Sequence, residues 1–594
     1  MMKKILFIIL LPLLLSLTAC TPDNNTDHSQ YADGEPVPVT EWLVRESVIG
    51  VNIDRYLSAM ESIGFSGAII VSQGDEVVLR KGYGLADRET RRPYTPNTIQ
   101  TSGSITKQFT GAVILLLESR GELSVNDPIT NYFDQVPEEK QDITIHQLLT
   151  HSSGITAGFG HDGDPMEKHT YLAGVMAKPL YFDPGTGYAY SNSGYSLLGM
   201  IVEQVSGANY EAFLRNELLL PSGMTNTGYV LPDWSRENMA VGYRNGEKWG
   251  LVHERGWIED GPNWVLRANG GLHTTVDDMY RWLINVKGRG VLDEDVARRW
   301  TTGYVSESNG YSEYGYGWVV YDHDKWGKVI THSGSNRIFE ADFGWLPERE
   351  LFFYIHGNNS MVPAASLSDN ILAAAFDSSF VMPPLVDIDD AVNPSAVQQR
   401  AGKYHLNGGY LDLKADDTRL VATLTGQSVF DLMFDHNDEQ KKRFTELNAR
   451  TRSAMNKMQA GREDALSGLI SEDGDAVTST APFLRRINQI GNLDSLHVIG
   501  TFSNEPGSLF YESGPWTTFV YAEFANWNQY WNLVWDEDET YKEDRSGPWP
   551  SFILLPAAEG HYTGIRQGAP WDMLELRFED DCLVATGQRA CPGI

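Results

Sequence analysis

A long apolar run in this chain begins directly after a serine and a lysine that lie one helical turn apart. Ser104-Ile105-Thr106-Lys107 is the only S-x-x-K, and the run that follows, Gln108 to Leu117, ends at Arg120-Gly121. A run this rich in Phe, Val, Ile and Leu predicts a buried helix over 104–120. The serine would lie beside the unpaired N–H groups of the first turn, and the lysine would return to the same face. A polar pair is therefore expected at the buried start of a helix.

This pair has a chemical interpretation and a structural one. Burial lowers the pKa of a lysine because it disfavours the charged form, and a neutral amine accepts a proton from a serine hydroxyl. Ser104 is then a candidate nucleophile with Lys107 as its base, and no histidine is required. Alternatively, Ser104 only caps the helix, as serines often do. Further motifs are needed to choose between the two.

The first twenty residues have the composition of a bacterial export signal. Lys3 and Lys4 precede an apolar stretch, Ile5 to Leu17, which is too short to span a bilayer comfortably as a mature helix. The stretch leads into Leu17-Thr18-Ala19-Cys20, which resembles the lipobox of bacterial lipoproteins. That resemblance implies that Cys20 is lipidated and becomes the mature N-terminus. Ordinary cleavage near Ala19 is the alternative.

A polar segment follows the signal, and residues 21–44 predict a flexible tether. In lipoproteins, an aspartate directly after the lipidated cysteine favours retention in the inner membrane. Residue 21 is a threonine, so an outer-membrane destination is open. We expect a protein that is exported to the cell envelope and attached to a membrane through its lipid alone.

The remaining length is too great for one core, so at least two domains are expected. Residues 45–380 have a mixed α/β pattern, 381–397 form a linker with several Pro and Asp residues, and 398–594 are β-rich.

The formal net charge of −32 argues against binding of nucleic acid or of anionic lipid surfaces. No sequence feature indicates an oligomeric state.

Within 45–380 the expected elements follow from periodicity. A strand hairpin is predicted where Gly67 to Val71 and Val77 to Leu79 flank the turn residues Gln73-Gly74-Asp75. Further elements are predicted as helices at 144–150, 194–205 and 364–375, and as strands at 329–331 and 351–355.

The C-terminal region contains a weak internal repeat. Gly402-Lys403-Tyr404 leads to Leu420 through Thr423, and Gly560-His561-Tyr562 leads to Leu583 through Thr586. Two related strand pairs at opposite ends of a domain suit a closed barrel whose ends meet, although chance similarity between β-rich segments is the alternative. Cys582 and Cys591 are close in sequence, so a disulfide closing a terminal hairpin is plausible in an exported protein. No metal-ligand spacing is present, and we expect no metal or organic cofactor.

Two more motifs join the S-x-x-K pair. Tyr190-Ser191-Asn192 precedes the helix predicted at 194–205. Its tyrosine is a candidate proton carrier if nearby lysines hold it as phenolate or strongly polarised, and Asn192 is a candidate donor to a substrate amide. His332-Ser333-Gly334 ends a predicted strand, where a small residue and a glycine let a substrate backbone approach. The backbone N–H groups of Ser104 and Ser335 are candidates for binding an oxyanion.

In this order and spacing, the three motifs resemble those of serine β-lactamases and penicillin-binding proteins, specifically the class C-like branch. Members have S-x-x-K, then Y-x-N, then a K-T-G-like triad. The resemblance covers about residues 45–380. Other stretches also match the family, namely Leu148 to Ile155, Pro184-Gly185 to Gly199, and Gly270 to Thr275 with Asp277-Asp278.

The resemblance implies an α/β (α+β) domain with an antiparallel sheet and a helical subdomain. It implies Ser104 as the acylated nucleophile, the Lys107–Tyr190 pair as the proton acceptor, and Asn192, His332, Ser333 and Gly334 as substrate contacts. His151 lies in a stretch that we interpret as structural. The C-terminal half is similar to the lipocalin-like or β-barrel domains attached to some of these hydrolases.

One position departs from the family pattern. His332 stands where β-lactamases usually have lysine, and an imidazole attracts a substrate carboxylate less strongly than a fixed ammonium. H-x-G is similar to the motif of certain D,D-peptidases, D-aminopeptidases and esterases. We therefore expect a serine hydrolase acting through an acyl-enzyme on amide or ester bonds, with cell-wall peptides containing D-residues as candidate substrates. The alternatives are a non-catalytic lipoprotein that binds wall fragments or a partner and, less favoured, a β-lactamase.

Overall fold

The computed structural model describes most of residues 42–592. The ranges outside the description are 1–41, 245–246, 308–309, 360–361, 384, 386–393, 417–418, 471–479, 482–483, 485–486, 488–492, 504–513, 525–526, 547–550, 559, 566–572, 586–587 and 593–594. The predicted signal, Cys20 and almost all of the tether thus lie outside the described residues. Within the described part, no helix is both long and apolar enough to cross a membrane.

A nine-stranded sheet forms the centre of the first domain, with strand order β1-β3-β2-β17-β16-β15-β14-β13-β12 and antiparallel pairing throughout. The predicted hairpin at its start is confirmed, with Gly74 in the left-handed conformation at its turn. The strands are β1 (Leu43–Val44), β2 (Gly67–Gln73), β3 (Glu76–Tyr83), β12 (Val305–Ser306), β13 (Glu313–Tyr314), β14 (Val319–His323), β15 (Gly327–Ser335), β16 (Glu340–Leu346) and β17 (Leu351–Gly357).

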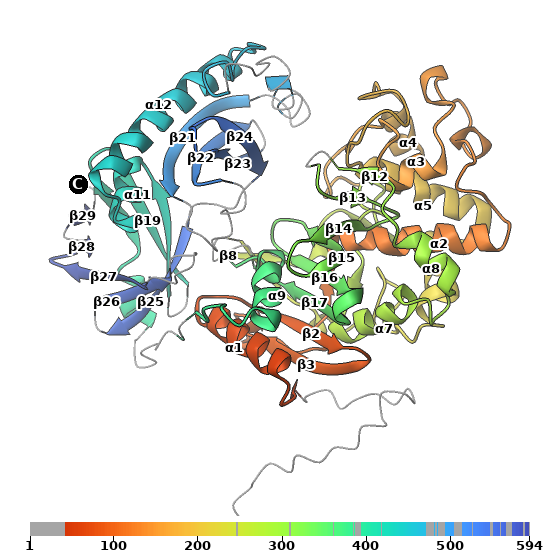
Figure 1. The fold of residues 1–594 in the computed structure, drawn as a ribbon, viewed down its shortest axis with the longest axis horizontal. Coiled ribbons are helices and arrows are strands. Elements are labelled where there is room, and N and C mark those ends of the chain that lie inside the picture. Colours follow the sequence, from red (N-terminus) through yellow and green to blue (C-terminus); the bar gives the residue numbers. More distant parts are fainter. Residues whose placement is uncertain are drawn as a thin grey trace, which may run out of the picture. The chain divides into compact units, whose positions relative to one another are not determined.

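Both faces of this sheet are covered, as Figure 1 shows. Along β17, Leu351, Phe353 and Ile355 enter one core, whereas Phe352 and Tyr354 enter the other. This alternation follows from the two-residue period of a strand. Helices α1 (Val48–Ser62) and α9 (Ser368–Phe376) pack on the first face, and α7 (Val276–Val286) contacts β2 and β17 on the second.

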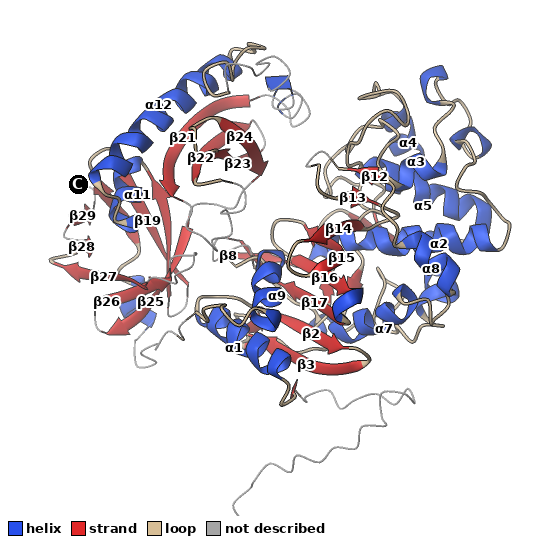
Figure 2. Ribbon diagram, in the orientation of Figure 1, coloured by secondary structure: helices blue, strands red, loops and turns tan. Residues whose placement is uncertain are grey.

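The helical part lies on the side of α7 (Figure 2). Its buried centre is α2 (Thr106–Ser119), in which every residue from Thr106 to Leu117 is buried. The predicted helices at 144–150 and 194–205 are confirmed as α3 (Ile145–Leu149), which starts with a capping box, and α5 (Asn192–Ser206), which Ser191 caps. The other helices here are α4 (Lys168–Met176), α6 (Tyr210–Leu214) and α8 (Glu294–Trp300).

The C-terminal region contains the predicted closed barrel. Its strands run β18-β19-β20-β25-β26-β27-β28-β29, and closure comes from pairing of β18 with β29. Cys582 and Cys591 form the predicted disulfide. The strands are β18 (Gly402–Leu406), β19 (Gly409–Asp416), β20 (Arg419–Thr425), β25 (Ser551–Ala558), β26 (His561–Ile565), β27 (Met573–Glu579), β28 (Cys582–Ala585) and β29 (Gln588–Pro592).

The sequence predicts a β-rich region here, but the structure also contains helices. Between β20 and β25 the chain forms α11 (Gln427–Phe434), α12 (Asp438–Gln459) and a four-stranded sheet. That sheet consists of β21 (Leu493–Ser503), β22 (Trp516–Phe524), β23 (Trp527–Trp535) and β24 (Tyr541–Ser546). Helix α12 forms because Phe444, Leu447 and Met455 recur at helical spacing and pack against β22 and β23 residues. A short helix, α10 (Pro394–Gln398), precedes the barrel.

Candidate active site

Ser104 lies at the entrance to helix α2, in the single 3-10 turn Gly103–Ile105. The turn packs against the C-terminal half of β15, and two glycines allow this close approach. A Cβ on Gly334 would lie 1.9 Å from the carbonyl oxygen of Ser102 and 2.9 Å from the nitrogen of Ser104. A Cβ on Gly103, which has φ +54°, would lie 2.7 Å from the nitrogen of Ser335. The backbone nitrogens of Ser104 and Ser335 are thus on adjoining segments.

Near Ser104, one edge of strand β15 is not paired with any other described strand. Its pairing with β14 stops at Thr331, whereas its pairing with β16 continues from His332 to Ser335. The stretch 332–335 therefore has a strand neighbour on one side and the Ser104 turn near the other. An unpaired strand edge of this kind accepts an extended peptide.

Lys107 is completely buried, yet no carboxylate is bonded to it. Its Nζ lies 2.7 Å from the carbonyl oxygen of Asn269, 2.8 Å from Oδ1 of Asn192 and 3.2 Å from Oγ of Ser104. Burial holds the pKa of Lys107 well below its ordinary value, with a small opposing effect of Asp162. The two amide oxygens only accept hydrogen bonds, so they use the two N–H groups of a neutral amine. The amine lone pair is then left for the Ser104 hydroxyl.

Tyr190 does not have the phenolate character that the sequence analysis considers. Burial raises the pKa of Tyr190 well above its ordinary value, and a hydrogen bond with the Ser104 hydroxyl opposes this only in part. Lys107 Nζ lies 4.8 Å from the centre of the Tyr190 ring, in contact with its face. The neutral phenol keeps its proton, so the base of this pair is Lys107, and Tyr190 is a donor within reach of Ser104.

His151 fixes the segment that supplies Tyr190 and Asn192. Its Nδ1 accepts from the N–H of Ser191 at 3.1 Å, and its carbonyl oxygen accepts from the N–H of Ala189 at 2.9 Å. The ring is buried, 4.2 Å from that of Tyr190. His151 thus holds in place the backbone around Tyr190, which is a structural role.

His332 is buried rather than turned toward a substrate. Its Nδ1 lies 2.6 Å from the carbonyl oxygen of Ser333, and its Nε2 lies 2.9 Å from the Tyr314 hydroxyl. Burial and the nearby Lys107 lower the pKa of His332 to about 3. The imidazole is therefore neutral, and both ring nitrogens bond to protein atoms. Ser333 is the exposed residue of the motif, and contact between His332 and a substrate stays a prediction.

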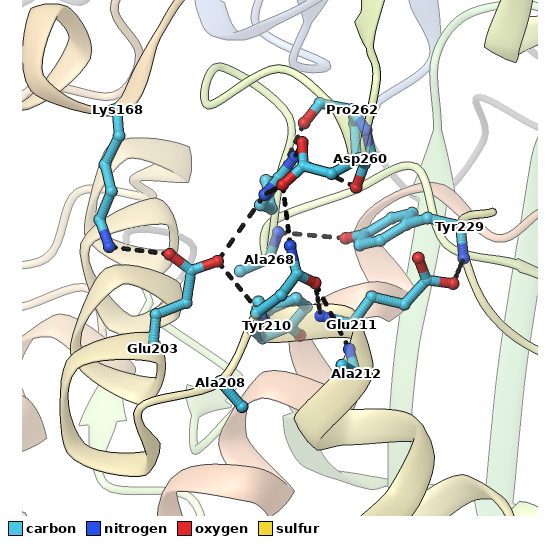
Figure 3. Close-up of polar contacts among 12 residues, drawn as sticks. Lys168, Glu203, Ala208, Tyr210, Glu211, Ala212, Tyr229, Asp260, Pro262 and Ala268 are labelled. Carbon is cyan, nitrogen blue, oxygen red and sulfur yellow. Dashed lines mark hydrogen bonds and ion pairs between the residues drawn. The ribbon is translucent and has the colours of Figure 1, made fainter. Parts of the chain in front are cut away.

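Sequence reasoning missed the Asn269 carbonyl, which accepts from Lys107. A polar network that includes Asp260, Tyr229 and Ala268 holds the chain next to it (Figure 3). Arg267 bonds through both terminal nitrogens to Asp260, at 2.9 and 2.6 Å, and through Nε to the carbonyl of Pro262. The Tyr229 hydroxyl accepts from the N–H of Ala268 and donates to the carbonyl of Gly270. Residues on both sides of Asn269 are thereby fixed.

A second layer of this network stabilises Tyr229 itself. The buried Glu211 carboxylate accepts from the N–H groups of Tyr229, Val230 and Leu231. Glu203 links Lys168, at 2.8 Å, to the N–H of Tyr210, at 3.0 Å. A backbone carbonyl has no residue-type signature, so the Gly270-Gly271 pair next to it was the only available signal.

Among the described residues, no group of three or more His, Cys, Asp or Glu is arranged to hold a metal ion.

Comparison with known proteins agrees with this geometry. A family model described as Beta-lactamase matches residues 57–376, which is more than half of the chain. The chain belongs to the β-lactamase family.

Its relatives include penicillin-binding proteins. Penicillin-binding protein 4* of Bacillus subtilis (strain 168) is 25% identical over 448 residues, covering 69% of this chain and 93% of that protein. The putative penicillin-binding protein PbpX of the same strain is 32% identical over 225 residues, 37% of this chain, and the chain spans 55% of the length of that relative. Among solved structures, the octameric penicillin-binding protein homologue from Pyrococcus abyssi has a TM-score of 0.49 at 18% identity, covering 91% of this chain and 98% of the other.

Proposed function

We propose that the chain is a serine hydrolase that cleaves amide or ester bonds through an acyl-enzyme, with Ser104 as nucleophile. The observation that supports this most is the environment of Lys107, a buried amine with no bonded carboxylate, 3.2 Å from the Ser104 hydroxyl. A purely structural lysine at this depth would be paired with an acid to offset the cost of burial.

In the proposed reaction, Ser104 Oγ attacks the substrate carbonyl carbon as its proton passes to Lys107. The N–H groups of Ser104 and Ser335 stabilise the oxyanion. The intermediate expels the amine or alcohol, which takes up a proton from Lys107 by way of the Tyr190 hydroxyl. Water then attacks the carbonyl carbon of the acyl-enzyme as its proton passes to the same groups. These groups return the proton to Ser104 Oγ, and the acid and free Ser104 are released.

The substrate class that we propose is a peptide or ester that lies extended along the free side of residues 332–335. The Oδ1 atom of Asn192 accepts from Lys107, so its Nδ2 is the atom that would donate to a substrate amide. Cell-wall peptides ending in D-residues are the first candidates. A β-lactam is less favoured because the neutral His332 offers no cation to a carboxylate.

The test is covalent labelling of the purified full-length chain with a fluorophosphonate, followed by mapping of the adduct by mass spectrometry. We expect label on Ser104, none in Ser104→Ala, and unchanged labelling in Ser119→Ala at the far end of the same helix. A folded protein without label would refute the hydrolase and favour the binding lipoprotein. Positive labelling leads to hydrolysis assays with D-Ala-terminated peptides, simple esters and a chromogenic cephalosporin.

We also propose export and lipid attachment through Cys20, on the strength of the lipobox-like sequence alone. Metabolic labelling with a radioactive fatty acid should mark the wild-type chain and leave Cys20→Ser unlabelled. Equal label in both would contradict the anchor without affecting the catalytic proposal.

A further inference from the structure

Tyr314 contacts two of the motifs at the site, although it belongs to neither. It lies in strand β13 and is fully buried. Its hydroxyl lies 2.9 Å from Nε2 of His332, and its ring meets the rings of His332 and Tyr190 edge to face, at 5.7 and 5.9 Å between centres. The residue therefore bridges the strand β15 side of the site and the Tyr190 side.

The two bonds of His332 define its protonation. The carbonyl oxygen of Ser333, 2.6 Å from Nδ1, can only accept, so Nδ1 has the proton. The Nε2 atom of a neutral ring is then an acceptor, and the Tyr314 hydroxyl is the donor to it. A protonated ring would need an acceptor at Nε2. The Tyr314 hydroxyl, which donates its proton to Nε2, would then have to rotate.

The position of Tyr314 is fixed by the glycines that follow it. A Cβ on Gly315 would lie 2.2 Å from the carbonyl oxygen of Thr302, and one on Gly317 would lie 2.6 Å from the carbonyl oxygen of Lys107 itself. Only glycine allows the chain to approach so closely the segment after α8 at Gly315 and helix α2 at Gly317. The loop after Tyr314 thus rests directly on the backbone of the catalytic lysine.

We propose that Tyr314 is a positioning residue whose hydroxyl holds the His332 imidazole uncharged and in one orientation beside Lys107. The proposal deepens the proposed function and rests on it for its effect on rate. The ionisable groups facing His332 are Lys107 from α2, His151 after α3, Tyr190 before α5 and Tyr314 itself. A charge on His332 would weaken Lys107 as a base, because two like charges this close oppose each other's protonation.

The first measurement does not depend on catalysis. The purified full-length chain is prepared with ¹⁵N-labelled histidine, and the His332 signals are assigned by their loss in His332→Gln. We expect the chemical shifts of a neutral ring protonated at Nδ1 down to pH 5 in the wild type, and a ring that takes up a proton above pH 5 in Tyr314→Phe. A charged or Nε2-protonated ring in the wild type, or identical titrations in the two proteins, would overturn the proposal.

The second measurement is the pH profile of fluorophosphonate labelling at Ser104. In Tyr314→Phe we expect an additional ionisation on the acid side, with the labelling rate about tenfold below wild type at pH 6 and recovering above pH 8. Tyr316→Phe is the matched control. Tyr316 lies two residues from Tyr314, and its hydroxyl makes the same kind of bond, 2.8 Å to Nδ1 of His146. A Tyr314→Phe profile that is only scaled, with the wild-type shape, would refute the positioning role. Absence of labelling in the wild type would refute the proposed function instead, and the histidine titration would still decide the proposal.

Discussion

Two buried basic side chains in the β-lactamase-family domain have opposite surroundings. Arg80 on β3 is 1% exposed, and its Nε and Nη2 each lie 2.6 Å from an oxygen of Asp277, at the start of α7. Lys107 is 0% exposed, and its three hydrogen-bond partners are two amide oxygens and a hydroxyl. The guanidinium of Arg80 is neutralised by a carboxylate in the fork geometry that suits arginine, whereas the amine of Lys107 has no bonded carboxylate.

The difference shows how the same fold separates a structural charge from a reactive group. A guanidinium cannot lose its proton in a protein, so its burial requires a counter-ion. An amine can escape the cost of burial by deprotonation, and this is the state that accepts a proton from Ser104. In the proposed mechanism, the absence of a bonded carboxylate at Lys107 is thus the feature that would make it a base.

The largest expected effect is on rate, in Lys107→Met. Removal of the base should lower fluorophosphonate labelling of Ser104 by about 10²- to 10⁴-fold. The folded state should tolerate the change, because an apolar chain of similar length replaces a desolvated amine. Labelling kinetics and thermal unfolding measured together test this. A loss of rate with a collapse of the melting temperature would mean that Lys107 is structural.

Arg80→Met should do the reverse. It leaves Asp277 without its partner, so we expect a loss of about 3 kcal/mol in the free energy of unfolding, at the low end for broken buried pairs because Asp277 is partly exposed. Ser104 labelling per folded molecule should be unchanged. Denaturant unfolding gives the first quantity, and active-site titration gives the second. A selective loss of labelling would show that the two regions are coupled.

Asn192→Asp would make Lys107 resemble Arg80. The new carboxylate would lie where Oδ1 now lies, 2.8 Å from Nζ, and would raise the pKa of Lys107 by about 1–3 units. Labelling near neutral pH should fall about 10- to 100-fold and recover in alkaline buffer. Asn192→Leu distinguishes this from loss of the amide, since its labelling should fall without alkaline recovery.

The smallest effect is on stability as a function of pH. The pKa of Lys107 is lower in the folded than in the unfolded chain, so between these values the unfolded chain binds more protons. Stability should therefore rise with pH across this window, by about 1.4 kcal/mol per unit from Lys107, with the full penalty present below it. The slope should disappear in Lys107→Met and persist in Arg80→Met. Equal slopes in wild type and Lys107→Met would contradict the lowered pKa.

Sequence motifs were sufficient to predict which side chains gather at Ser104. Ser104, Lys107 and Asn192 are joined by hydrogen bonds in the structure, and Tyr190 and His332 lie beside them. The motifs could not show protonation states, because burial determines these. Burial favours the neutral phenol of Tyr190 over the phenolate, and it favours the neutral imidazole of His332.

Two other features were missed for different reasons. Asn269 acts through its carbonyl, which every residue has, and Tyr314 becomes visible only when β13 and β15 are placed near each other. Helix α12 has a capping box at Asn437 and Gln440, but its polar composition and the surrounding strand-like runs masked its period. The hairpin and α2 were predictable because their apolar patterns are clear, and the barrel was predicted from the weak internal repeat of strand pairs.

Barrel closure has a consequence for synthesis and folding. Tyr404 and His405 in the first barrel strand pair with Pro592 and Cys591 in the strand that follows all other described ones. During translation, β18 therefore has one unsatisfied edge until residues 588–592 have emerged. Such an edge is a site for pairing with another chain. Between the appearance of β18 and that of β29, this edge is open to such pairing.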